Sequence, residues 1–498
     1  MLETCDLTLN YESEDFSKYL KTLQKRLNLL EQQVQAKKIP VLIVLEGFGA
    51  AGKGSTISAL IAALDPRYFK VYSTKPPTED ERRFPFLQRF WAKTPERGKI
   101  AIFDRSWYYD IYLPVIDKEH KLKKYAGKIR EINVFEKQLY DDGAAVIKLF
   151  LHISKAEQKK RFETLELSPD TRWRVTKEDW KHNKQYDRYY ETFDALLNAT
   201  DSTYAPWHVI PSTNQRYAIV SVYETVIAAL EQAISRADKA ADAPVLPIRK
   251  SDDIKLLPIP KLRDVDLNKS LQKEEYRILL KQRQKKLFSL HNMLYKKKIP
   301  LILAYEGWDA AGKGGNIKRM TSALDPRGYE VISIQAPTPL EKAHHHLWRF
   351  WTQLPKDGHI AIFDRTWYGR VMVERFEGFC SENDWHRAYD ELNQFERSLY
   401  EWGAIILKFW IHIDKDTQLA RFTERQNTPE KQWKITEEDW RNREKWDLYE
   451  QGADEMLSRT NTEYAPWVIV ESNDKQYARI KAMDAVIEQI EKRLKEEK

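Results

Sequence analysis

The strongest constraint on the fold of this chain is an internal repeat in which corresponding residues lie 260 positions apart. KIAIFDRSWY at residues 99–108 and HIAIFDRTWY at residues 359–368 share eight of their ten residues. At the same offset, GKG at residues 52–54 recurs at residues 312–314. Solenoid proteins repeat shorter units many times, so this pattern indicates duplication of a whole domain.

The repeat divides the 498 residues into two copies joined by a linker. We expect the first copy at residues 1–238, the linker at residues 239–260 and the second copy at residues 261–498. The four prolines of the linker are typical of an extended connector. Each copy has the length of a domain that buries its own core.

Charge and cysteine content exclude several protein classes. The 82 basic residues nearly cancel the 75 acidic ones, and no long basic tail or acidic block dominates. Two cysteines cannot form a disulfide framework, the first residues lack the pattern of an export signal, and the apolar runs are strand-sized. We therefore expect a cytoplasmic protein with neither a membrane nor a nucleic-acid partner.

Helix and strand patterns alternate along the second copy. Helices are expected at residues 274–297 and 314–324, and strands at residues 301–305, 330–334, 360–363, 405–411 and 468–470. Strands separated by helices predict an α/β fold, a parallel sheet wrapped by helices with functional sites at the carboxyl ends of the strands. The charged, helical stretch at residues 415–449 is a candidate lid.

A phosphate-binding loop is the clearest chemical signal. Gly307, Gly312, Lys313 and Gly314 form the pattern G-x-x-x-x-G-K-G directly after the first strand of the second copy. Glycines allow a tight turn, and the lysine and the start of the next helix favour phosphate. A glycine turn without a ligand is the alternative, which the recurrence of strand, loop, lysine and helix disfavours. Because Gly314 replaces the usual magnesium-binding Ser or Thr, we expect Asp309 to supply that oxygen.

A second carboxylate, Asp364, ends the apolar strand IAIF, where a Walker B aspartate binds magnesium. A lone strand-end aspartate is more often a helix cap, but its pairing with the phosphate loop favours the metal role. Arg365 and Arg370 follow, and a guanidinium group binds two phosphate oxygens at once. Arg421 and Arg425 lie four residues apart on the predicted lid helix, where a solvated charged face is an equal alternative.

Together these motifs resemble the polyphosphate kinase 2 family. The resemblance covers both copies and rests on EGWDAAGKGG at residues 306–315, FDRTWYGR at 363–370, RFxxR at 421–425 and W-K-x-T-x-x-D-W at 433–440. It implies two tandem P-loop kinase-like domains with helical lids, and magnesium-dependent phosphoryl transfer between inorganic polyphosphate and a nucleotide. Family members made of two fused copies produce ADP from AMP, which is the activity we expect.

The resemblance also implies roles for individual residues and a tendency of the chain to self-associate. Asp309 would be the catalytic aspartate and would hold Mg²⁺ together with Asp364, and Lys313 would be the loop lysine. The residues implied to bind phosphate are Arg365, Arg370, Arg421 and Arg425. Pro337 and Thr338, after the second strand, would border the nucleotide.

The first copy departs from these motifs at the positions that matter for chemistry. Gly49 corresponds to Asp309, Asp110 to Arg370, and Leu165 to Arg425, whereas the loop lysine and the strand-end aspartate remain. An acid in place of an arginine repels phosphate. We therefore expect the second copy to be catalytic and the first copy to be degenerate, either structural or a weak polyphosphate-binding surface.

Three alternative functions remain open. An ATP-dependent nucleoside monophosphate kinase would share the fold but would normally have Ser or Thr after the loop lysine. A polyphosphate-dependent kinase that makes ATP from ADP is disfavoured only by the duplication. A non-catalytic polyphosphate-binding scaffold fits the first copy and leaves the complete motif set of the second copy unexplained.

Two further expectations concern aromatic and imidazole side chains. Five tryptophan pairs recur at the repeat offset and are expected in the cores, at positions 91/351, 107/367, 173/433, 180/440 and 207/467. The three consecutive histidines His344 to His346 are expected on a surface helix, where their side chains would point in different directions rather than bind one metal ion.

Overall fold

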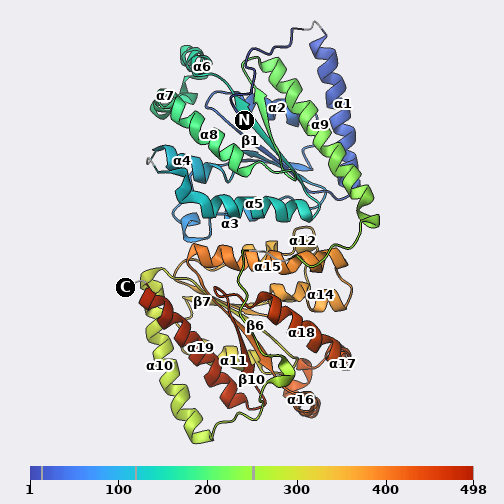
Figure 1. Cartoon of the computed structure of the whole chain (residues 1–498), viewed down its shortest axis with the longest axis vertical. Coiled ribbons are helices and arrows are strands. Elements are labelled where there is room, and N and C mark those ends of the chain that lie inside the picture. Colours follow the sequence, from blue (N-terminus) through green and yellow to red (C-terminus); the bar gives the residue numbers. More distant parts are fainter. Residues whose placement is uncertain (13–14, 118–119, 250–252, 497–498) are drawn as a thin grey trace. The chain divides into compact units, whose positions relative to one another are not determined.

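The computed structural model describes residues 1–12, 15–117, 120–249 and 253–496, which fold into two compact units (Figure 1). Unit 1 contains residues 1–82, 86–244 and 338–348, and unit 2 contains residues 83–85, 245–337 and 349–498. Each unit therefore holds almost all of one copy of the repeat. The limits of the predicted linker, residues 239–260, stay a prediction, and residues 250–252 within it lie outside the described residues.

Unit 1 is built around a parallel five-stranded sheet with the strand order β2-β3-β1-β4-β5. Its strands are β1 Val41–Gly47, β2 Phe69–Ser73, β3 Ile100–Asp104, β4 Ala145–His152 and β5 Trp207–Pro211. Its helices are α1 Phe16–Ala36, α2 Lys53–Ile61, α3 Gln88–Trp91, α4 Tyr109–Asp117, α5 Ala126–Asp141, α6 Lys155–Leu167, α7 Lys177–Lys184, α8 Tyr186–Thr200 and α9 Gln215–Lys239.

Unit 2 repeats this sheet with the order β7-β8-β6-β9-β10, again all parallel. Its strands are β6 Leu301–Gly307, β7 Tyr329–Ser333, β8 Ile360–Asp364, β9 Ile405–His412 and β10 Trp467–Glu471. The longer helices are α10 Lys273–Lys297, α11 Lys313–Thr321, α15 Glu382–Trp402, α16 Lys415–Asn427, α17 Glu437–Glu444, α18 Trp446–Thr460 and α19 Lys475–Glu496. The short helices of the second copy are α12 Pro339–Lys342, α13 Trp348–Trp351 and α14 Val373–Phe376.

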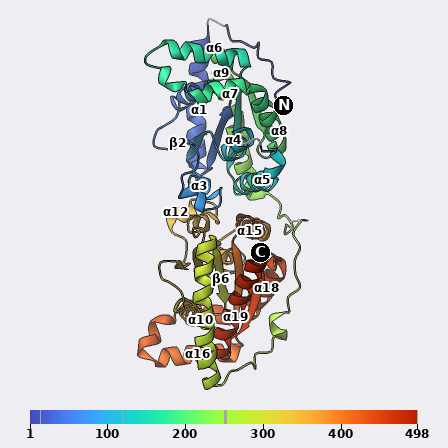
Figure 2. The ribbon, with the colours of Figure 1, turned by 90° about the vertical axis from the view of Figure 1, so that its left-hand side faces the viewer.

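The expected α/β fold is confirmed in both units. In unit 2, α19 and α15 both pack on β9, with α10 beside α19 and α18 beside α15 (Figures 1 and 2). Every residue of β9 is buried, as is typical of a parallel strand covered on both faces. The expected strands of the second copy are all present, and their ends shift by at most two residues.

The strand register brings the predicted functional groups to one edge of the sheet. Asp364 pairs with Tyr305, and Gly307 pairs with Ile411, so the phosphate loop and Asp364 emerge at the carboxyl ends of adjacent strands. The corresponding strands of unit 1 have the same register. Duplication has therefore preserved the framework of the site in both units.

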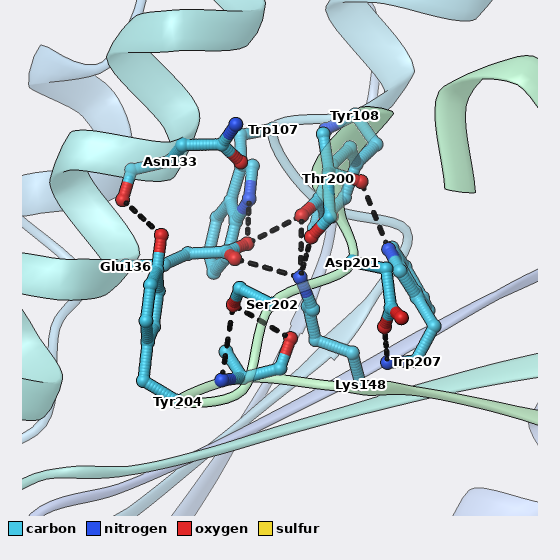
Figure 3. A network of polar contacts seen from close by, with 12 residues as sticks. Trp107, Tyr108, Asn133, Glu136, Lys148, Thr200, Asp201, Ser202, Tyr204 and Trp207 are labelled. Carbon is cyan, nitrogen blue, oxygen red and sulfur yellow. Dashed lines mark hydrogen bonds and ion pairs between the residues drawn. The ribbon is translucent and has the colours of Figure 1, made fainter. Parts of the chain in front are cut away.

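A buried ion pair lies at the centre of unit 1 (Figure 3). Lys148 on β4 lies 2.8 Å from Glu136 on α5, and neither side chain is more than 1% exposed. The Glu136 carboxylate also accepts hydrogen bonds from Trp107 Nε1 (2.9 Å) and the Tyr108 hydroxyl (2.5 Å). The Lys148 ammonium group also donates a hydrogen bond to the carbonyl oxygen of Thr200. The pair thus ties the segment after β3 to the sheet and to α5.

Unit 2 contains the same buried pair between Lys408 on β9 and Glu396 on α15, with a separation of 2.7 Å. Trp367 and Tyr368 donate to Glu396, and Lys408 donates to the carbonyl oxygen of Thr460. Burial lowers the pKa of Lys408 to about 8, whereas burial raises the pKa of Glu396. Burial is the main cause of both shifts, and each partner opposes the shift of the other, as expected for two opposite charges in the interior.

The expectation that five tryptophan pairs lie in the cores is only partly correct. The pairs at 91/351, 107/367 and 207/467 are buried, and the pair at 180/440 is half-buried. Trp173 and Trp433 are 71% and 75% exposed. They lie in the short 3₁₀ helices Arg172–Arg174 and Pro429–Lys434, the second of which belongs to the candidate lid at residues 415–449.

The expectation that His344 to His346 form a surface helix is wrong. These residues lie outside any helix, between α12 and α13, and the side chains of His344 and His345 are buried. The His344 ring stacks on Trp348, with ring centres 4.3 Å apart, a contact that the run of identical residues does not indicate.

Among the described residues, one helix, α9, is long and apolar enough to cross a membrane by length and composition. Within unit 1 this helix packs along α1, α2, β4 and β5. Its apolar face therefore belongs to the core of that unit, as is common for core helices of this length.

Replacing Lys408 by Met tests the buried pair. We expect Lys408→Met to lower the free energy of unfolding of unit 2 by about 3–5 kcal/mol, because Glu396 would remain as a buried, unpaired carboxylate. Urea unfolding followed by circular dichroism measures this loss. Lys155→Met is the control, since the Lys155–Asp187 pair is 46% and 81% exposed and should contribute under about 1 kcal/mol. A similar small loss for both variants would contradict the prediction.

Candidate active site

The predicted phosphate-binding loop of unit 2 begins at Gly307, where a side chain would clash with the backbone of β9. Gly307 has a φ of +137°, and a Cβ atom there would lie 2.3 Å from the carbonyl oxygen of Ile411. Gly312, with a φ of +113°, precedes α11 in the left-handed region. The chain can therefore turn sharply and present the N-terminus of α11 to a ligand.

Lys313 folds back over this loop. Its Nζ donates to the carbonyl oxygens of Gly307 (2.6 Å) and Trp308 (3.2 Å). The equivalent Lys53 of unit 1 makes the same two contacts, and burial lowers its pKa to about 8. The lysine thus places a cation at the mouth of the loop in both units, next to the helix N-terminus, which favours an anion.

Asp309 lies within the loop and is held by two donors. Arg365 Nη2 donates to Asp309 Oδ1 at 3.3 Å, and Asn442 Nδ2 donates to Asp309 Oδ2 at 3.0 Å. Arg365 follows β8 directly and has a φ of +64°, an uncommon conformation for a residue other than glycine. The structure therefore brings Arg365, which is 56 residues farther along the chain, to Asp309 in the loop that also carries Lys313.

Glu306 is a half-buried residue of the site that was not predicted from the sequence. Its carboxylate accepts hydrogen bonds from Thr366 N (2.7 Å) and Thr366 Oγ1 (2.8 Å), which fixes the turn after Asp364. Burial raises the pKa of Glu306, and the nearby Lys313 opposes this shift. Glu46 of unit 1 contacts Ser106 in the same way, so the role is structural. An acidic residue near the end of a buried strand in both copies is the signal that could have revealed it.

Arg421, predicted to bind phosphate, contacts the loop itself. Its guanidinium group is buried and donates to the carbonyl oxygens of Ala310 (3.0 Å), Ala311 (2.9 Å) and Ser472 (2.6 Å). Burial, followed by the nearby Arg425, lowers the pKa of Arg421 to about 10. Arg161 of unit 1 binds two of the equivalent carbonyl groups, those of Ala50 and Ser212. These contacts shape the loop, and direct phosphate binding by Arg421 stays a prediction.

A cavity of about 190 Å³ lies beside the loop and is lined by cationic side chains. The cationic residues are Arg421, Arg425, Lys431, Lys475 and Arg479, with Glu424 as the single acid of the lining. Burial, and then the proximity of Arg421, lowers the pKa of Lys475. At the repeat offset, the first copy has Leu165, Thr171, Gln215 and Ile219 in place of the last four cations. Four of the five cations around this cavity are therefore replaced by uncharged residues at the equivalent positions of the first copy.

The charge reversal between Arg370 and Asp110 has a local explanation. In unit 2, Arg370 pairs with Glu374 at 3.0 Å. In unit 1, Asp110 pairs with Arg89 at 2.8 Å, and both side chains are less than 10% exposed. The acid of unit 1 therefore neutralises a buried arginine as part of the packing.

An aromatic stack holds the residue before Asp309. Trp308 stacks on Trp446 at a ring distance of 3.8 Å, and its Nε1 donates to His412 Nδ1 at 3.0 Å. His412 Nε2 lies 3.1 Å from the carbonyl oxygen of Leu262, which can only accept, so Nε2 carries the proton of a neutral ring. Burial lowers the pKa of His412 to about 4, which keeps the ring neutral. The chain that enters the second copy at Leu262 thus supports the loop.

The nucleotide contact predicted for Pro337 and Thr338 stays a prediction. The Thr338 side chain caps α12 by accepting a hydrogen bond from Glu341 N at 3.3 Å. This contact accounts for a Thr at this position without a ligand.

Comparison with known proteins places the chain in one family. The polyphosphate kinase 2 (PPK2) family profile matches it twice, at residues 10–238 and 270–498. A polyphosphate:AMP phosphotransferase of Pseudomonas aeruginosa is 39% identical over 502 residues, with 100% of each chain covered. An ADP-polyphosphate phosphotransferase of Rhizobium meliloti is 38% identical over 221 residues, which cover 44% of this chain and 72% of the relative. A crystal structure of a polyphosphate kinase 2 from Pseudomonas aeruginosa PA01 has a TM-score of 0.86 at 36% identity, with 100% of each chain covered.

The neutral His412 predicts how stability depends on pH. Its pKa is about 4 in the folded chain and 6.5 ordinarily, so between these values the unfolded state binds more protons. Stability should therefore fall as the pH drops from about 6.5 towards 4, by up to roughly 3 kcal/mol from this group. Thermal unfolding across this pH range checks the slope. His412→Asn should show a smaller dependence of stability on pH than wild type. Some dependence should remain, because His152 of unit 1 also has a pKa lowered to about 4. An unchanged slope in the variant would refute the prediction.

Proposed function

We propose that this chain, which belongs to the polyphosphate kinase 2 family, transfers the terminal phosphoryl group of inorganic polyphosphate to AMP and releases ADP. The observation that carries the proposal is the full-length similarity to the Pseudomonas relative named for this activity. The phosphate loop and the cationic cavity of unit 2 support it, because both suit a polyanionic donor. The loop carboxylate, Asp309, supports it as an oxygen ligand for the cation that accompanies such a donor.

ADP as the acceptor, with ATP as the product, is the second candidate. The similarity to the Rhizobium ADP-polyphosphate phosphotransferase favours it, but that similarity covers only 44% of this chain. Supplying AMP or ADP with polyphosphate and separating the nucleotides by chromatography distinguishes the two acceptors. An ATP-dependent monophosphate kinase would require ATP as donor in the same assay.

Catalysis belongs to the second copy in this proposal. That copy alone has a carboxylate in the loop, Asp309, and alone has Arg425, Lys475 and Arg479 around the cavity. The first copy keeps the contacts that shape the loop, including those of Arg161 to backbone carbonyl groups. The first copy thus keeps the contacts that shape the loop and lacks the charged residues proposed to bind metal and phosphate, which supports a structural role for it.

The reaction requires mainly positioning and charge neutralisation. An oxygen of the AMP phosphate attacks the terminal phosphorus of polyphosphate in line with the bond that breaks. Lys313 and the N-terminus of α11 stabilise negative charge on the transferred group, and Arg365 and Arg370 bind its oxygens. The AMP phosphate is already ionised near neutral pH, so the protein needs no strong general base. The cationic cavity holds the remainder of the polyphosphate chain.

Asp309 and Asp364 are the residues that would hold Mg²⁺. Their carboxylate oxygens are the ligands this ion prefers, and they emerge at the same edge of the sheet beside the phosphate loop. Gly314 offers no hydroxyl group, which leaves the metal role to these carboxylates. When bound, Mg²⁺ supplies positive charge to the reacting phosphates.

The surroundings of the enzyme follow from charge and family. We propose a cytoplasmic location and self-association, with neither a membrane nor a nucleic-acid partner. The near balance of 82 basic and 75 acidic residues supports the absence of a nucleic-acid partner, since such partners favour a strongly basic surface. Self-association is proposed from the family resemblance.

A matched pair of substitutions tests the division between the copies. Asp364→Asn should lower the rate of ADP formation at least roughly 100-fold, because a metal-binding carboxylate is lost. Asp104→Asn, the same change at the equivalent strand end of unit 1, should leave the rate within about twofold. The assay contains Mg²⁺, polyphosphate and AMP, and chromatography measures ADP.

Comparable losses in both variants would show that both copies turn over. A wild-type chain that forms no ADP from AMP would end the proposed function itself.

A further inference from the structure

The lid of unit 2 contacts the phosphate loop at Asp309 and at its neighbour. Asn442 on α17 donates through Nδ2 to Asp309 Oδ2 at 3.0 Å. Gln418 on α16 donates to the backbone carbonyl oxygen of Asp309 at 3.1 Å. Trp446, at the start of α18, stacks on Trp308. Of these contacts, only that of Asn442 reaches the carboxylate.

Unit 1 shows which of these contacts the fold requires. There Gln158 donates to the carbonyl oxygen of Gly49 at 3.0 Å, as Gln418 does at Asp309. Phe48 stacks on Tyr186, with ring centres 4.5 Å apart, in place of the two tryptophans. The third contact, between Asp309 and Asn442, has no counterpart in unit 1, where Gly49 and His182 stand at these two positions. The lid of unit 1 therefore packs on its loop without this pair.

The joint loss of both partners indicates that the pair serves chemistry rather than folding. A contact needed to close the lid would be expected in both units, as the glutamine and aromatic contacts are. The amide of Asn442 instead disappears from the copy whose loop carboxylate has disappeared.

We propose that Asn442 is a positioning residue, which orients the Asp309 carboxylate for phosphoryl transfer once the lid is closed. This inference rests on the proposed function of the second copy. Asp309 is fixed from two sides, by Arg365 at Oδ1 and by Asn442 at Oδ2. A neutral amide suits this task, because it fixes the orientation of the carboxylate without cancelling the charge that binds a cation.

The two donors to the Asp309 carboxylate come from different parts of unit 2. Asn442 is on α17 of the lid, whereas Arg365 follows β8 of the sheet. The carboxylate therefore receives its second donor only when α17 lies against the loop.

Steady-state kinetics of Asn442→His and Asn442→Ser test the proposal. We expect kcat to fall about 10- to 100-fold, since a small displacement of a reacting group has effects of this size. KM for AMP and for polyphosphate should change less than about threefold, because the cations that bind phosphate remain. The thermal midpoint should stay within about 2 °C of wild type, since unit 1 folds with His182 at this position. Asn442→Asp should be slower than Asn442→Ser, because a second carboxylate would repel Asp309.

Two controls separate positioning from a merely structural role. His182→Asn, the reverse change in unit 1, should leave kcat unchanged. Combining Asn442→His with Asp309→Asn should produce no further loss beyond that of Asp309→Asn alone, because the two residues act as one unit.

Several outcomes would overturn the inference. The first is a kcat of Asn442→His equal to that of wild type, and the second is a change in KM without a change in kcat. The third is a drop in the thermal midpoint large enough to explain the loss of activity. The fourth is a double variant whose loss of kcat is the sum of the two single losses in free energy. If these occur while Asp364→Asn is inactive, the inference fails and the proposed function stands. If wild type itself makes no ADP, the proposed function fails first.

Discussion

Each unit depends on an ion pair that has no access to solvent. Lys408 and Glu396 in unit 2, like their counterparts in unit 1, are buried and hydrogen-bonded on every side. Because Glu396 also binds Trp367 and Tyr368, the pair fixes the chain just after Asp364. The residues that follow this aspartate can therefore face the phosphate loop in one defined arrangement. The presence of the pair in both units marks it as part of the scaffold.

Comparison of the two copies within one chain separates scaffold from chemistry. The contacts present in both units shape the loop: the buried pair, the acid before the first loop glycine, and the arginine that binds loop carbonyl groups. The groups present only in the second copy are charged and face the places where phosphate and metal would bind, namely Asp309, Arg425 and Lys475. The first copy therefore keeps the packing contacts and has Gly49, Leu165 and Gln215 at the positions of Asp309, Arg425 and Lys475.

Much of the fold could be predicted from the sequence because its signals are local. Buried parallel strands appear as apolar runs, and the loop glycines and Lys313 are adjacent in the chain. Asn442 and Asp309 are separated by 133 residues, and no periodicity connects them. The sequence likewise gives no sign that Lys475 and Arg479 line the cavity beside the loop, or that His412 supports Trp308. Arg421 shows a different limit, since its residue type suits phosphate while its burial directs it to carbonyl groups.

The most direct measurement of the central claim, that only the second copy binds the reacting phosphates and their metal, is crystallographic. Crystals of the full chain are soaked with Mn²⁺ in place of Mg²⁺ and with short polyphosphate, and anomalous scattering is measured at a wavelength where manganese contributes. We expect an anomalous peak at Asp309 and Asp364, with phosphate density along the cavity lined by Arg425 and Lys475. No peak is expected at Asp104 of the first copy. Equal peaks in both copies, or a peak at Asp104 alone, would contradict the claim.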